Sequence, residues 1–139
     1  MKIVAFLAVV LAGMFLSGCA SAAEEKTASP ARAEYVRITP EKAHAMLGED
    51  PEIILVDVRT PEEYAEKHIP GARLIPNESI QKEPIEGLAK DAVIFVYCRT
   101  GHRSQQAANK LLDMGYEHVY DIEGGITHWP YETEAGAAK

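Results

Sequence analysis

The residues of this chain best suited to chemistry surround Cys98, which follows an apolar run at 93–97 and precedes the sequence Arg99-Thr100-Gly101-His102-Arg103. A thiol has an ordinary pKa of about 8.5, and its thiolate form is the nucleophile. The two arginines, with a helix expected to start at Ser104, would favour the thiolate and attract an oxyanion. Gly101 would let successive backbone N–H groups point toward one ligand. We therefore expect Cys98 to react and residues 99–103 to bind the substrate.

These residues also have more ordinary interpretations. A cysteine is often an inert buried side chain, and most arginines are solvated surface charges. Asp57 and Arg59, at the end of another apolar run, are expected to support neighbouring loops rather than to react. The five histidines include no i,i+4 pair and no cysteine or acidic partner at metal-binding spacing. We therefore expect neither a metal site nor an organic cofactor.

The elements around Cys98 are predicted from apolar patterns. The run at 93–97 is short, β-branched and aromatic, as in a strand buried on both faces. Beyond Ser104, apolar residues recur at helical spacing up to Gly115, where the helix should end. A cysteine between such a strand and such a helix lies where open α/β sheets bind their ligands.

The remaining elements alternate between strands and helices. Thr39 and Thr60 each precede a proline and should cap a helix; Glu63 completes a capping box with Thr60. The predicted strands are an edge strand at 35–38, a buried strand at 53–58, a short strand at 72–75 and a last strand at 118–120. The segment at 80–89 has a weak helical pattern, and the segment at 126–129 allows at most one helical turn. This order predicts an α/β domain, with a mostly parallel sheet and helices on both faces.

The first part of the chain predicts export. Residues 1–18 combine Lys2 with an apolar stretch at 3–16 that is short for a membrane span, as in a signal peptide. The following Leu16-Ser17-Gly18-Cys19 resembles the lipobox of bacterial lipoproteins, in which the cysteine is acylated and becomes the mature N-terminus. The alternative is an ordinary cleaved signal with Cys19 merely nearby. We expect a lipid-anchored protein on the periplasmic or cell-surface side of a membrane, with Cys98 as its one free thiol.

Composition sets the domain boundaries and excludes some partners. Residues 19–33 are small and polar, as in a flexible tether, so the domain should span 34–130 and leave a disordered tail at 131–139. The formal net charge of −7 argues against nucleic acid and against electrostatic docking to anionic lipid. We expect a monomer.

Four segments together resemble the rhodanese-like sulfurtransferase family. They are DVRTPEEY at 57–64, HIPGA at 68–72, VYCRTGHRS at 96–104 and EGGI at 123–126, with Trp129 following. The resemblance implies an α/β fold around a five-stranded sheet and a cysteine that carries sulfane sulfur as a persulfide. The partners would then be a small sulfur donor such as thiosulfate and a thiophilic acceptor, with Cys98 loaded and unloaded in a double displacement.

Two other functions fit parts of the sequence. Phosphatases and arsenate reductases use a related loop that resembles Cys-x5-Arg, whereas here Arg103 follows Cys98 after four residues, which suits sulfur better than a phosphoryl group. A persulfide carrier or sensor that acts with a partner protein would need the same cysteine. The sequence does not separate that carrier from an enzyme.

Overall fold

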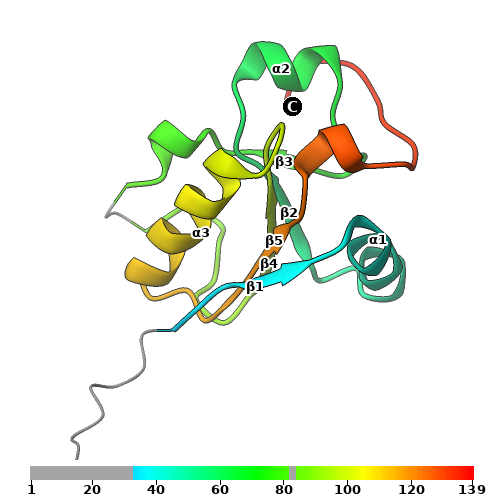
Figure 1. Ribbon diagram of the computed structural model, residues 1–139. Helices are drawn as coiled ribbons and strands as arrows, with labels where there is room; N and C mark the ends of the chain where they lie inside the picture. Colours follow the sequence, from blue (N-terminus) through cyan, green and yellow to red (C-terminus); the bar gives the residue numbers. More distant parts are fainter. Residues whose placement is uncertain (1–32, 82–83) are drawn as a thin grey trace, which may run out of the picture. The chain divides into compact units, whose positions relative to one another are not determined.

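Five parallel strands form the centre of the domain, in the order β1-β5-β4-β2-β3 (Figure 1). The computed structural model describes residues 33–81 and 84–139. The strands are β1 (Val36–Ile38), β2 (Ile54–Asp57), β3 (Arg73–Leu74), β4 (Val93–Tyr97) and β5 (His118–Ile122). β4 lies between β2 and β5, so the strand that leads to Cys98 is central. This confirms the parallel α/β sheet predicted from the sequence.

Helices cover both faces of this sheet, as predicted. They are α1 (Pro40–Glu49), α2 (Pro61–Glu66) and α3 (His102–Asp113), with short 3-10 helices η1 (Asn77–Ser79) and η2 (Gly125–His128). Figure 1 shows α3 on one face and α1 on the other. Because side chains alternate along a strand, β4 contributes Ile94 and Val96 to the core beneath α3, and Phe95 and Tyr97 to the core on the α1 side.

The predicted caps start two of the helices. The Thr39 side chain accepts from the Lys42 N–H at the start of α1. At the start of α2, Thr60 and Glu63 form both hydrogen bonds of the capping box. α3 starts at His102 instead of Ser104, because Gly101 takes its N-cap position with a left-handed φ of 108°.

Two predictions from the sequence are wrong. The described residues of 80–89 form no helix; Pro84 and Gly87 interrupt the segment, and Ile80 and Leu88 are buried in the core instead. The tail at 131–139 is not free of the domain: Glu134 forms an antiparallel bridge with His68, and the Gly136 N–H donates to the Ala65 carbonyl at 2.9 Å. Backbone hydrogen bonds hold this segment, and they leave no apolar pattern in the sequence.

The predicted signal peptide (1–18), the lipidation at Cys19 and all but the end of the tether (19–33) lie outside the described residues. Within 33–81 and 84–139, none of the helices has the length and apolar character needed to cross a membrane.

Candidate active site

Cys98 follows the carboxyl end of β4 and is a free cysteine with 1% of its surface exposed. The Gly101 N–H donates to its sulfur at 3.0 Å. The sulfur also lies 3.5 Å from the Ser104 Oγ, and the Ser104 hydroxyl donates to the Gly101 carbonyl at 3.1 Å. The sulfur therefore lies inside the turn that starts α3, next to a backbone donor and a hydroxyl that can act as donor or acceptor.

η2 holds the backbone of the cysteine loop in place. The Ile126 N–H donates to the Cys98 carbonyl at 2.9 Å, and the Thr127 N–H and hydroxyl donate to the Arg99 carbonyl at 3.1 and 2.7 Å. Gly125 has a left-handed φ of 59°, and a Cβ at this position would lie 2.6 Å from the Arg99 carbonyl oxygen. A side chain there would displace the loop, so the glycine turn after β5 is part of the site.

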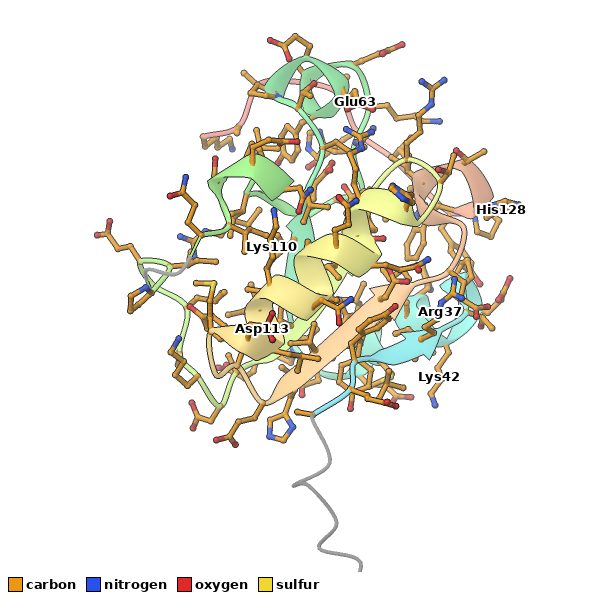
Figure 2. The ribbon with its side chains drawn as sticks, turned by 60° about the vertical axis from the view of Figure 1, so that its left-hand side comes forward. Arg37, Lys42, Glu63, Lys110, Asp113 and His128 are labelled. Atoms are coloured by element: carbon orange, nitrogen blue, oxygen red, sulfur yellow. The ribbon has the colours of Figure 1, made fainter. Side chains whose placement is uncertain are left out.

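Arg103 is bound to Glu63 of α2. Its Nη1 and Nη2 donate to the Glu63 Oε2 and Oε1 at 2.7 and 2.8 Å, a bidentate geometry. The Arg103 guanidinium lowers the pKa of Glu63 to about 2, although partial burial opposes the shift. Figure 2 labels Glu63 on α2. Arg103 therefore fixes α2 to the start of α3, and its charge is largely balanced within the protein.

Arg99 has a different environment. It is exposed, and it takes part in none of the ion pairs found within the described residues. It lines a cavity of about 510 Å³ together with Lys67, Glu66 and Thr127. Of the two loop arginines, Arg99 is thus the one whose charge remains available to a small anion.

The other loop residues expected to bind substrate are Thr100, Gly101 and His102. Thr100 and His102 are exposed, and Gly101 is buried. Of these three, Gly101 is the residue with a hydrogen bond to the Cys98 sulfur. The substrate-binding roles of Thr100 and His102 therefore stay predictions, whereas Gly101 contacts the sulfur.

Asp57 and Arg59 form a buried ion pair at the end of β2. The Arg59 Nε donates to the Asp57 Oδ1 at 2.9 Å and Nη2 donates to Oδ2 at 2.6 Å. The Tyr97 hydroxyl donates to the same carboxylate at 2.8 Å and accepts from the Ile69 N–H at 3.1 Å. Arg59 also donates to the Lys67 carbonyl at 2.6 Å. Burial and the nearby carboxylate raise the pKa of Tyr97. This network ties β2 and β4 to residues 67–69.

Three residues of the site were not predicted as members of it. The sequence pattern predicts only a helix start at Ser104, although the first turn of a helix after such a loop lies next to the thiol. The sequence pattern predicts only a cap of α2 at Glu63, and it indicates no role for Thr127.

Within the described part of the chain, no three His, Cys, Asp or Glu side chains are grouped so that they could hold a metal ion.

Most of this chain is similar to known proteins. The family model described as "Rhodanese-like domain" matches residues 39–131. A protein of Pseudomonas entomophila named thiosulfate sulfurtransferase GlpE is 39% identical over 110 residues, which cover 76% of this chain and 98% of that protein. A protein of Allochromatium vinosum named sulfurtransferase is 38% identical over 92 residues, with coverages of 66% and 85%.

Solved structures show the same fold. A rhodanese-like domain protein from Staphylococcus aureus superposes with a TM-score of 0.66 at 31% identity, over 73% of this chain and 99% of that one. A rhodanese from E. coli, solved with anions, has a TM-score of 0.54 at 36% identity, over 60% of this chain and 99% of that one.

Proposed function

This chain belongs to the rhodanese-like domain family, and on this basis we propose that it moves sulfane sulfur from thiosulfate, or a similar donor, to a thiophilic acceptor through a persulfide on Cys98. It is a rhodanese-type sulfurtransferase. The observation that carries the proposal is the position of the Cys98 sulfur at the start of α3, 3.0 Å from the Gly101 N–H. A donor at that position can bind the anionic sulfur of a thiolate or a persulfide.

The first half of the reaction loads the cysteine. The Cys98 thiolate attacks the outer sulfur of thiosulfate, a new sulfur–sulfur bond forms, and the bond to the sulfite sulfur breaks. Sulfite leaves with the electron pair of that bond. Arg99, exposed beside the cavity, supplies positive charge for the anionic donor and for the departing sulfite. The Gly101 N–H and the Ser104 hydroxyl hold the sulfur of Cys98 for this attack.

The second half unloads the cysteine. A thiophilic acceptor, such as cyanide or a thiolate, attacks the terminal sulfur of the persulfide. The bond to the Cys98 sulfur breaks, and the Cys98 thiolate is restored with the electron pair. In each step one nucleophile displaces another at a sulfur atom, so the cycle balances without an external oxidant or reductant.

The ion pair of Arg103 also bears on the phosphatase alternative. In a Cys-x5-Arg loop that binds a phosphoryl group, the arginine at the end of the loop would bind the oxyanion. Here both terminal nitrogens of Arg103 donate to Glu63 instead. The arrangement therefore supports sulfur transfer over phosphoryl transfer.

Steady-state turnover tests the proposal. We expect saturable formation of thiocyanate from thiosulfate and cyanide by the wild-type protein, and its complete loss in Cys98→Ala. Asn109→Ala, a change to an exposed residue of α3 outside the loop, serves as the control and should keep most of the turnover. Loading of one sulfur per chain without turnover would instead identify a carrier or sensor, and equal turnover in Cys98→Ala would contradict both.

The location of the protein is a separate proposal, which the sequence alone supports. We propose that Cys19 is acylated and anchors the domain outside the cytoplasm, because the segment before it resembles a lipobox. Incorporation of labelled palmitate into the full chain, and its loss in Cys19→Ala, would test this. Equal labelling of both proteins would contradict the proposal.

A further inference from the structure

Asp121 is a buried carboxyl that the reaction above does not use. It lies in β5 with 0% of its surface exposed. Neither of its oxygens has a hydrogen-bond partner in the described structure. A buried polar group without a partner costs stability, and a buried charge costs more. Packing alone does not explain an aspartate at this position, where an apolar residue would be more stable.

Its place in the sheet puts Asp121 behind the cysteine loop. It pairs in register with Val96 of β4, two residues before Cys98. It lies two residues after Val119 in the same strand, so both side chains point to one face, and Val119 belongs to the core beneath α3. Ser104, in the first turn of α3, is fully buried and lies 3.5 Å from the Cys98 sulfur. Asp121, Ser104 and Cys98 are thus gathered on one side of the sheet.

The groups around Asp121 decide whether it is charged. Arg37 of β1 reaches it at 3.5 Å, but the Arg37 side chain is 47% exposed and its charge is screened by solvent. The Ser104 hydroxyl of α3 also favours the carboxylate, whereas Glu123 opposes it. Burial is the largest influence, and it raises the pKa of Asp121. Figure 2 labels Arg37 beside β1 and β5.

We propose that Asp121 is a positioning residue that acts through the Ser104 hydroxyl to stabilise the anionic sulfur of Cys98. This inference rests on the proposed sulfur transfer, because that reaction needs Cys98 as thiolate and persulfide. In the structure the thiol is placed to donate to the Ser104 Oγ, and the Ser104 hydroxyl donates to the Gly101 carbonyl. When the thiol loses its proton, Ser104 turns its hydroxyl toward the sulfur. Its oxygen then accepts from the neutral Asp121 carboxyl.

The charge state of Asp121 therefore selects the direction of the Ser104 hydroxyl. A neutral carboxyl has a proton to donate, so Ser104 is free to donate to sulfur. A carboxylate has acceptors only; it would take the Ser104 proton, and the sulfur anion would lose that donor. Burial raises the pKa of Asp121 and so favours the form that the reaction needs.

The test measures the rate at which iodoacetamide alkylates Cys98 as a function of pH, for Asp121→Asn and Asp121→Leu. Both variants remove the charge, but only the asparagine keeps a donor for Ser104. We expect the midpoint of the pH profile in Asp121→Asn to lie about one pH unit below that of Asp121→Leu, the tenfold effect of one hydrogen bond to a charged group. Adding Ser104→Ala should abolish the difference.

Equal midpoints in the two variants would overturn the proposal, because charge removal alone would then explain any effect. If Asp121→Leu does not fold, as judged by circular dichroism, the wild type and Asp121→Asn are compared. The pH profile of the wild type should be broader than the curve for one ionising group, and the profile of Asp121→Asn should match that curve. Coincident profiles of the two proteins would overturn the proposal. Persulfide formation from thiosulfate is measured in parallel. Its failure with the alkylation difference intact would refute the sulfur transfer and leave the role of Asp121 standing.

Discussion

The ion pair between Glu63 and Arg103 predicts a specific dependence of stability on pH. The perturbation is Glu63→Gln, which removes the negative charge but keeps a side chain able to complete the capping box with Thr60. The paired carboxylate has a pKa of about 2, against an ordinary value of 4.5. Because the pKa is lowered in the folded state, the stabilisation is present above about pH 4.5 and is lost as the pH falls toward about 2.

The size of the effect follows from the exposure of the pair. A shift of this size would correspond to about 3 kcal/mol if solvent did not screen it. The side chains of Arg103 and Glu63 are 30% and 24% exposed, so screening reduces the contribution, as for other partly exposed pairs. The bidentate geometry favours the upper end of the range for such pairs, and we expect about 1 kcal/mol.

Urea unfolding at about pH 6 and about pH 3 measures this contribution. We expect Glu63→Gln to be less stable than the wild type by about 1 kcal/mol at the higher pH, and the difference to shrink at the lower pH. Glu66→Gln is the matched control, because Glu66 is an exposed residue of the same helix. Parallel losses of stability in the wild type and Glu63→Gln over this range would refute the reasoning.

Three further predictions concern the loop and its support. Arg99→Gln should raise the KM for thiosulfate about tenfold, whereas Arg103→Gln should change it less, because the charge of Arg103 is already balanced; equal effects would contradict this. Gly125→Ala should abolish turnover, because its Cβ would clash with the backbone of the cysteine loop. Gly48→Ala is the control: the space around Gly48 in α1 is open, so this variant should keep its turnover and unfold at a slightly higher temperature than the wild type. Tyr97→Phe should cost roughly 1.5–3 kcal/mol in urea unfolding, because it removes a hydrogen bond to a buried carboxylate; a change below about 0.5 kcal/mol would contradict this.

The sequence was sufficient to predict the elements that position the thiol. The apolar run at 93–97 has the length and β-branched character of a central strand, and Cys98 comes directly after it. The caps at Thr39 and Thr60 use side chains a few residues from their partners, so they are visible in a local pattern. Signals of this kind join residues that are close in the sequence, and they predict most of the helices and strands.

The contacts that shape the chemistry of the site join residues far apart in the sequence. Glu63 and Arg103 are 40 residues apart, and no local sequence pattern shows that Glu63 of α2 lies next to Arg103 at the start of α3. Asp121 is a polar residue in a short strand, and its burial depends on α3 covering that face. The sequence predicts a disordered tail because residues 131–139 offer little to bury, yet Gly136 is held by a backbone hydrogen bond. Such contacts follow from the tertiary structure rather than from residue type.

The central claim is that the sulfur being transferred is carried by Cys98. Mass spectrometry of the intact protein after treatment with thiosulfate tests it most directly. We expect the wild type to gain the mass of one sulfur atom, located on the peptide that contains Cys98, and to lose it again when cyanide is added. Cys98→Ser should gain nothing. A wild-type protein whose mass does not change, or a gain that persists in Cys98→Ser, would contradict the account.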